Sequence, residues 1–147
     1  MPFDPYNLTP TASLNRLRIV DLPGLSLPAD VKGKIGFELV SASFVCQQIR
    51  EHAVELQLST DELAQDERQL PIVLDRCFQS VDPSVRVAAQ AIAMKLGRNL
   101  AYLLLTLKRG DEVNRAARDD WDNSNWDYWS RIRLVRFGDG LVRGSLQ

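Results

Sequence analysis

The residues best suited to contact a ligand form a glycine turn, Gly138, Asp139 and Gly140. They follow residues 132–137, a short run rich in branched and aromatic side chains that predicts a strand. Glycines in such a turn let the backbone approach a ligand closely, and their amide groups can face a phosphate or a nucleoside. The spacing therefore predicts a cofactor-binding turn at Gly138, Asp139 and Gly140. The alternative is a turn that only reverses the chain.

The segment before this strand holds all three tryptophans of the chain, interleaved with aspartate and asparagine: Trp121, Trp126 and Trp129. Its acids alternate as in the first half of a calcium loop, but Arg131 stands where the closing glutamate belongs. Exposed tryptophans beside acids could instead stack on a sugar ring. More commonly, tryptophans anchor an irregular loop to a core while the indole N–H finds a hydrogen-bond partner. We expect an irregular loop whose tryptophans are core anchors, with a binding surface as the alternative.

The other residues that could support catalysis are few and far apart in the sequence. His52 lies at the edge of an apolar helical stripe with no implied nucleophile or carboxylate beside it, so we expect a partly buried structural histidine. Cys46 and Cys77 have no CxxC spacing and do not complete a zinc site with one histidine. They are expected to be buried free thiols. We therefore predict no catalytic residue and no metal site.

Apolar periodicity and capping residues predict a mainly helical fold, an α/β fragment with a few short strands. A reciprocal capping pattern begins one helix at Ser59, and Asp82 followed by Pro83 begins the most strongly predicted one. Around residues 100–105 apolar side chains surround the whole helix, so we expect burial on nearly all sides. Residues 17–22 are a second candidate strand. The helices are expected over about 37–57, 60–79, 83–109 and 111–118.

Length and composition fit a single domain or part of one. The 147 residues are 45% hydrophobic, which is enough to bury a core without disulfides or metals. We expect residues 17–147 to form this domain. Residues 1–16 have the composition of an N-terminal arm that becomes ordered only when it docks on something.

Charge and hydropathy indicate which classes of partner the protein binds and in which cellular compartment it is found. The formal net charge of −1 argues against a nucleic-acid binder, which needs clustered positive charge. The first residues lack the basic start and the apolar run of a signal peptide. The longest dense apolar stretch is far shorter than the roughly 20 residues of a membrane span. We therefore expect a cytoplasmic protein that binds neither nucleic acid nor membrane.

The order of the later elements resembles a known superfamily. A long buried helix, an irregular insertion, a strand and a glycine turn follow one another over about residues 84–144. This order is similar to the late adenosine-binding segment of the actin-like ATPase and sugar-kinase superfamily, particularly its ROK-type members. The resemblance implies that the backbone of Gly138, Asp139 and Gly140 passes close to a bound ATP. Asp139 departs from the run of glycines that the family has there.

Other motifs of that superfamily are not found in the sequence. It has no DxGxT phosphate loop, no second glycine-threonine phosphate loop and no cysteine cluster of the ROK zinc motif. The resemblance therefore implies a partial nucleotide-binding subdomain that is not catalytically competent alone. The alternative is a non-enzymatic helical interaction domain, which binds a protein partner or forms a homo-oligomer. In that case the Trp/Asp segment or an exposed helix face would be the docking surface.

Overall fold

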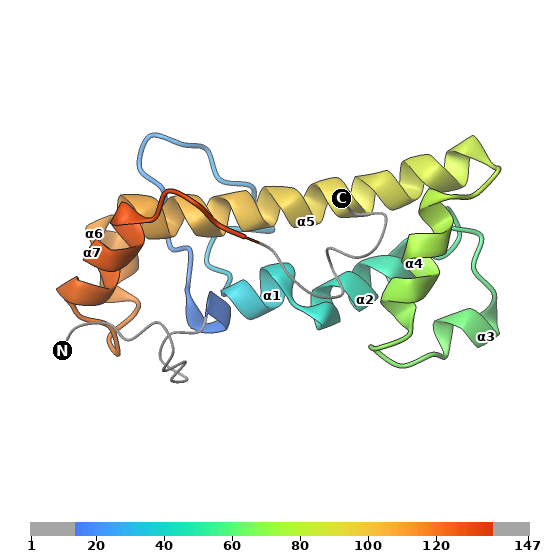
Figure 1. The fold of residues 1–147 in the computed structure, drawn as a ribbon, viewed down its shortest axis with the longest axis horizontal. Helices are drawn as coiled ribbons and strands as arrows, with labels where there is room; N and C mark the ends of the chain where they lie inside the picture. Colours follow the sequence, from blue (N-terminus) through green and yellow to red (C-terminus); the bar gives the residue numbers. More distant parts are fainter. Residues whose placement is uncertain (1–13, 137–147) are drawn as a thin grey trace. The chain divides into compact units, whose positions relative to one another are not determined.

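The computed structural model describes residues 14–136, and this part of the chain is mainly helical, as the sequence predicts (Figure 1). It divides into two compact units. Residues 14–39 and 99–135 belong to the first unit, and residues 40–98 belong to the second. The long helix α5 (Pro83–Arg109) contributes to both units, because the boundary falls within it.

Helix α5 begins and ends where the sequence predicts. Asp82 caps its first turn, since Oδ1 accepts hydrogen bonds from the Ser84 amide at 2.8 Å and the Ser84 hydroxyl at 2.7 Å. Lys108 and Arg109 favour the negative end of the helix dipole. Gly110 follows with a φ of 55°, a left-handed conformation that glycine adopts readily. Neither α5 nor any other described helix is both long and apolar enough to cross a membrane.

The second unit is built from α2 (Ala42–Glu51), α3 (Thr60–Leu63), α4 (Leu70–Phe78) and the N-terminal half of α5. The reciprocal cap expected at Ser59 is present, because its hydroxyl accepts from the Glu62 amide at 3.2 Å and its amide donates to the Glu62 carboxylate at 2.8 Å. Apolar side chains of α2, α4 and α5 form the core of this unit: Val45, Ile49, Leu70, Leu74, Val85, Ala89 and Ile92.

The helix predicted over 37–57 is divided in two and ends early. Ser41 separates α1 (Gly36–Val40) from α2, because its hydroxyl accepts a hydrogen bond from the Phe44 amide at 3.2 Å. A capping serine in an extended conformation begins a new helix rather than continuing the old one. Residues 52–57 form turns instead of further helix.

The helix predicted over 60–79 is also two helices, α3 and α4. Between them the Asp66 carboxylate accepts hydrogen bonds from the amides of Arg68 at 2.9 Å and Gln69 at 3.2 Å. Such local bonds offer the backbone an alternative to the helix, which explains the interruption. Pro71 lies in the first turn of α4, where its missing amide proton breaks no helical hydrogen bond.

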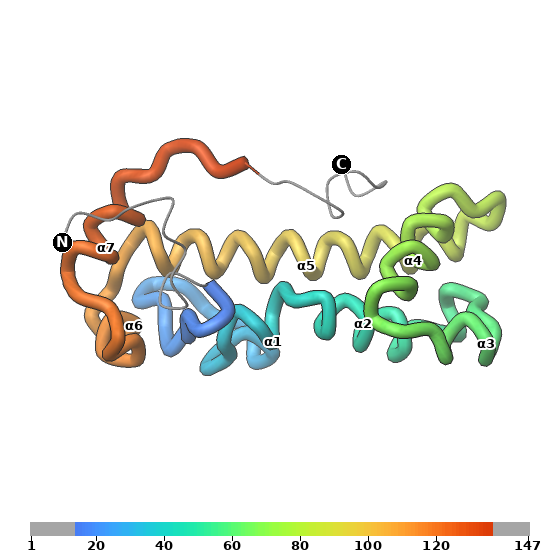
Figure 2. Tube along the Cα trace, turned by 60° about the horizontal axis from the view of Figure 1, so that its bottom comes forward, coloured from blue at the N-terminus to red at the C-terminus, as the bar shows by residue number. Residues whose placement is uncertain are grey.

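The first unit contains η2 (Leu14–Arg16), residues up to Leu39, the C-terminal half of α5, α6 (Glu112–Ala116) and α7 (Asn123–Arg131). Figure 2 shows α6 and α7 at the C-terminal end of α5. The candidate strand over 17–22 is not a strand. Within residues 14–136 the only β pairing is one antiparallel bridge, between Arg18 and Ile35.

Two different partners pair the backbone of residues 17–22: residues 33–36 bond to the first half, with the Ile19 amide donating to the Lys34 carbonyl at 3.0 Å, and a buried asparagine bonds to the second half. The Asn114 side chain on α6 accepts hydrogen bonds from the amides of Val20 at 2.8 Å and Asp21 at 3.2 Å. It also donates to the Asp21 carbonyl at 2.7 Å. Backbone polar groups away from water must be paired, and one side chain from far along the sequence pairs those of the second half. The loop is therefore fixed on α6 without a sheet.

The Trp/Asp segment contains a helix, α7, where its composition predicts an irregular loop. Asp122 begins this helix, because its carboxylate accepts from the Asn125 amide at 3.4 Å and the Asn125 side chain accepts from the Asp122 amide at 3.0 Å. This is the reciprocal arrangement of a capping box, with asparagine in place of the usual glutamate or glutamine.

The strand expected over 132–137 is wrong for the residues that the structure describes. Residues 132–136 belong to no helix or strand, and Phe137 lies outside the described range. Ile132 has extended backbone angles, which end α7, but no neighbouring segment between residues 14 and 136 pairs with it as a strand. Branched side chains favour an extended backbone, and a ladder also needs a partner.

Candidate functional site

The turn predicted to bind a cofactor, Gly138, Asp139 and Gly140, lies outside the described residues. Nucleotide binding there stays a prediction. The resemblance to the sugar-kinase superfamily also uses a strand directly before this turn. Residues 132–136 contain no such strand, so the described part of the chain lacks that element of the pattern.

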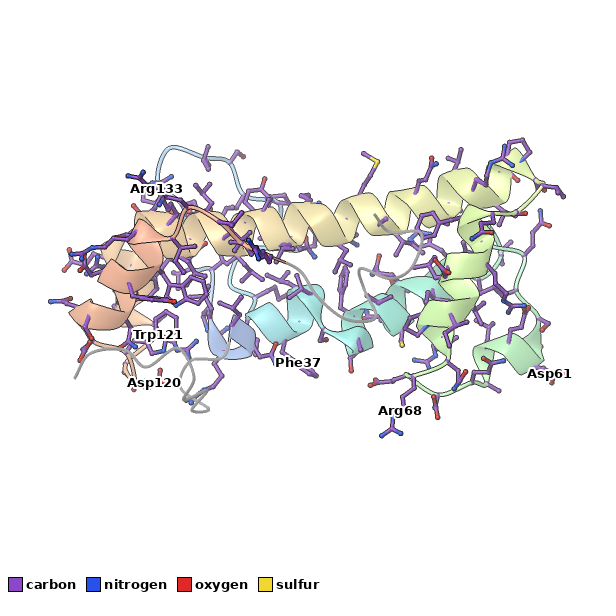
Figure 3. The ribbon with its side chains drawn as sticks, in the orientation of Figure 1. Phe37, Asp61, Arg68, Asp120, Trp121 and Arg133 are labelled. Atoms are coloured by element: carbon purple, nitrogen blue, oxygen red, sulfur yellow. The ribbon has the colours of Figure 1, made fainter. Side chains whose placement is uncertain are left out.

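Two of the three tryptophans anchor the chain in the core of the first unit. Trp126 is 1% exposed and Trp121 is 7% exposed, and their rings meet edge to face with centroids 5.2 Å apart. The Arg118 guanidinium lies 4.2 Å from the centre of the Trp121 ring. Figure 3 labels Trp121 and its neighbour Asp120 before α7. Their burial confirms the anchoring interpretation for these two tryptophans.

The aspartate directly before Trp121, Asp120, forms two ion pairs within the first unit. Arg118 is buried, and its Nε donates to the Asp120 carboxylate at 2.9 Å. Burial lowers the pKa of the Arg118 guanidinium, whereas Asp120 raises it, and an arginine remains protonated under such conditions. Asp120 also pairs with Arg16 at 3.2 Å. One carboxylate thus connects η2 with the chain that follows α6.

Trp129 differs from the other two tryptophans because it is only partly buried and lines a groove. The groove belongs to the first unit, has a volume of about 400 Å³, and lies between the C-terminal half of α5 and the end of α7 with the residues after it. We call it the α5 groove. Its lining is almost entirely apolar and consists of Ala101, Leu104, Leu105, Leu107, the stem of Lys108, Trp129, Ile132 and Val135.

Helical spacing produces the floor of the α5 groove. Ala101, Leu104 and Leu105 are three and four residues apart and therefore share one face of α5. Leu103 lies on another face and is fully buried. The all-round apolar character of residues 100–105 predicts burial on nearly all sides, but Ala101 is exposed and Leu104 and Leu105 are only partly buried. The described residues do not cover this apolar face completely.

Lys108 holds the opposite wall of the α5 groove in place. Its ammonium group donates hydrogen bonds to the carbonyl oxygens of Ser130 and Ile132, the latter at 2.9 Å. Carbonyls at a helix C-terminus have no helical partner, and the helix dipole favours a cation there. One lysine therefore caps α7 and fastens the start of the following segment to α5.

Replacing Lys108 with methionine is expected to loosen this wall while keeping the apolar stem. The substitution removes two hydrogen bonds from a charged donor, so we expect the free energy of unfolding to fall by about 1 kcal/mol at this solvent-exposed position. Urea unfolding measures this change. Lys32→Met is the matched control, because Lys32 makes only a surface ion pair with Asp21 at 3.7 Å. Equal losses in the two variants would contradict the capping role of Lys108.

The chain segment that contributes Ile132 and Val135 to the α5 groove also carries positive charge beside them. Lys108, Arg131 and Arg133 are cationic, whereas Asp127 is the one acid between Asn123 and Val135. Arg131 pairs with Asp127 across one turn of α7. Arg133, labelled in Figure 3, lies on the segment that follows α7 and is exposed. Because the whole chain has a net charge of −1, this excess is local.

The Asp122 cap is expected to make α7 sensitive to acid. Hydrogen bonds from the Ser124 hydroxyl and amide hold the pKa of Asp122 below its ordinary value. A carboxylate with a depressed folded-state pKa stabilises the fold above its unfolded pKa of about 3.9, and this contribution disappears as the pH falls through the folded value. Amide NMR signals of α7 should therefore change below about pH 4, and less so in Asp122→Asn, which keeps a capping oxygen. Identical pH profiles for both proteins would contradict this account.

A smaller pocket of about 230 Å³ lies in the second unit and has a mixed lining. Glu62 and Arg76 form an ion pair on its wall at 3.1 Å, and Gln57 beside them has a left-handed φ of 55°. Cys77 also lines it. Burial raises the pKa of the Cys77 thiol, which opposes formation of the nucleophilic thiolate. The pocket therefore offers an ion pair but no activated nucleophile.

The remaining candidates for chemistry have structural surroundings. Cys46 and Cys77 are buried free thiols, as expected, and burial raises the pKa of Cys46 too. His52 is partly buried at the end of α2, where its amide donates to the Gln48 carbonyl at 3.0 Å. Within residues 14–136 no group of three histidine, cysteine, aspartate or glutamate side chains is placed to hold a metal ion.

Sequence reasoning misses the α5 groove, although a signal for it is present. The signal is the excess of apolar residues around residues 100–105, close in the sequence to a tryptophan-rich segment. The same pattern is equally typical of a fully buried helix. No family model, curated protein or solved structure matches this chain. Its function must therefore be inferred from the chemistry of its own residues.

Proposed function

We propose that this chain is a non-enzymatic helical docking domain that binds a segment of a partner protein in the α5 groove. The observation that carries the proposal is the apolar floor of Ala101, Leu104 and Leu105 beside the partly buried Trp129. Removing such a surface from water is favourable by roughly 25 cal/mol per Å². Tryptophan is also among the residues that most often dominate protein interfaces, and Trp129 lines this groove.

The chemistry of the α5 groove supports recognition rather than catalysis. Its lining residues include no carboxylate, histidine or thiol. Lys108 is its one titratable side chain, and the ammonium group is occupied by the carbonyls of Ser130 and Ile132. General acid–base or nucleophilic catalysis needs a reactive group within hydrogen-bond reach of the substrate. An apolar segment of a partner is a better match to this surface than a reacting substrate.

Affinity capture with matched variants tests the proposal. The tagged chain is expressed in its own cells as wild type, Leu105→Glu and Met94→Glu, and captured proteins are quantified by mass spectrometry. Met94 is the control because it lies on α5, is 75% exposed and does not line the groove. We expect specific partners to be retained by wild type and Met94→Glu and lost with Leu105→Glu. The same proteins in equal amounts from all three would refute the proposal.

Nucleotide binding at Gly138, Asp139 and Gly140 remains a separate proposal, supported by the sequence resemblance alone. It predicts weak binding of ATP without phosphoryl transfer, because the phosphate-loop motifs of the superfamily are not found. Calorimetric titration of the chain with ATP tests it. A lack of any heat of binding at millimolar nucleotide would remove this proposal and leave the docking function untouched.

We also propose that the chain acts in the cytoplasm. The support is chemical: Cys46 and Cys77 are both buried and unpaired, and free thiols persist in a reducing compartment. Fluorescent tagging of the chain in its own cells tests this location, and an extracellular or periplasmic signal would contradict it.

A further inference from the structure

We infer that the segment bound in the α5 groove is an acidic amphipathic helix of a different protein. This inference rests on the proposed docking function and adds the chemistry of the partner. The floor of the groove is itself a helix surface, on which Ala101, Leu105 and Lys108 repeat at intervals of four and three residues. A second helix can lay its own i, i+3, i+4 and i+7 side chains along such a surface, with ridges in grooves.

The wall of the groove favours a helix over an added β-strand. Ile132 and Val135 both line the groove. Residues 132–136 belong to no strand, and the Ile132 carbonyl already accepts a hydrogen bond from Lys108. This wall therefore has no regular edge with which an extended peptide could form a ladder. It supplies apolar side chains, and the partner is expected to bring leucine or aromatic anchors.

The charges beside the groove favour an acidic partner. Lys108 and Arg133 are exposed, and Arg131 retains an exposed side chain while it pairs with Asp127. Arg131 and Arg133 adjoin the lining residue Ile132 in the sequence, so carboxylates that flank an apolar helix face would come near these cations. Charge complementarity of this kind governs specificity and association rate. Apolar anchors on the floor and glutamates or aspartates beside them together define the amphipathic helix that we infer.

The same charges disfavour a second copy of this chain as the occupant. In a symmetric pair the same patch contacts itself, so each groove would bring its own arginines and lysine toward those of the other. Like charges placed opposite each other weaken association. The cations that favour binding of an acidic helix therefore oppose pairing of two copies of this chain. We assign the groove to a segment of a different protein.

Three matched synthetic peptides test the chemistry of the occupant. Each has about 18 residues, or five helical turns. The first peptide has leucine at i, i+3, i+4 and i+7 and glutamate on its polar face. The second peptide has lysine in place of glutamate. The third peptide has the acidic composition of the first and two central prolines, which prevent a continuous helix. We expect the acidic helix to bind the full chain with a dissociation constant of about 10 μM, and the other two at least tenfold more weakly. Arg133→Glu should weaken the acidic peptide by roughly tenfold.

Several results would overturn the inference. Tighter binding of the lysine peptide, equal binding of the proline peptide, or no binding of the acidic peptide would each refute an acidic helical occupant. Groove-dependent binding of anionic lipid vesicles or single-stranded RNA without binding of the acidic peptide would refute it as well. If Leu105→Glu abolishes capture of a cellular partner while the acidic peptide fails, only this inference is lost. If capture is unaffected by Leu105→Glu, the docking function itself is lost.

Discussion

The variant Trp126→Ala is expected to lower the free energy of unfolding of the first unit by about 3 to 5 kcal/mol. Trp126 is 1% exposed, meets Trp121 edge to face and lies 5.8 Å from the guanidinium of Arg115. Its removal leaves a cavity at the base of α7. Because domains are stable by only about 5 to 15 kcal/mol, much of the unit's stability should be lost. Urea unfolding followed by circular dichroism measures the change.

Trp126→Phe is the matched control for this prediction. It keeps an aromatic ring and much of the apolar volume, so it should cost clearly less than the alanine variant. Val54→Ala, at a side chain that is 87% exposed, should leave the unfolding curve almost unchanged. An unfolding curve of Trp126→Ala that overlays the wild type would show that Trp126 is not a core anchor.

The variant Trp129→Ala is expected to do the opposite: it should keep the fold and lose the partner. Trp129 is only partly buried and lines the α5 groove, so its truncation opens no enclosed cavity. Tryptophans at the centre of an interface commonly contribute at least about 2 kcal/mol, which corresponds to a roughly 30-fold loss of affinity. The readout is binding of the partner that wild type captures and Leu105→Glu does not.

Both halves of this prediction must hold together. The helical signal and the urea midpoint of Trp129→Ala should stay close to the wild type, whereas partner binding falls. Trp129→Phe should restore much of the binding, since a phenyl ring still fills part of the groove. If Trp129→Ala unfolds the chain as Trp126→Ala does, the tryptophan is a core residue. If it binds the partner normally, the groove is not the docking surface.

The parts of the fold that were predictable are those with local signals. Helix α5 is bounded by Asp82 with Pro83 at one end and Gly110 at the other, and all of these act on their own neighbours. The predicted helices over 37–57 and 60–79 are divided where Ser41 and Asp66 accept backbone hydrogen bonds. Apolar periodicity continues across both positions in the sequence, so it predicted one continuous helix in each case instead of two.

The parts that were not predictable depend on distant residues or on unusual variants of a local motif. The Asn114 side chain pairs the backbone of Val20 where a partner strand was expected. No local sequence signal near Val20 predicts this contact. The cap of α7 uses Asn125 where the familiar pattern has glutamate or glutamine, so the helix was mistaken for a loop. The α5 groove depends on which apolar side chains of α5 remain uncovered. Composition cannot show that without the packing of the first unit.

Site-specific photo-crosslinking in living cells tests the docking function most directly. A photoreactive phenylalanine analogue is placed at Val135, which lines the groove and is 41% exposed, and separately at Val54, which is 87% exposed in the second unit. The docking function predicts a discrete adduct with another protein at Val135, lost in Leu105→Glu and missing at Val54. No adduct at Val135, or equal adducts at both positions, would contradict the assignment of the α5 groove as a protein-docking site.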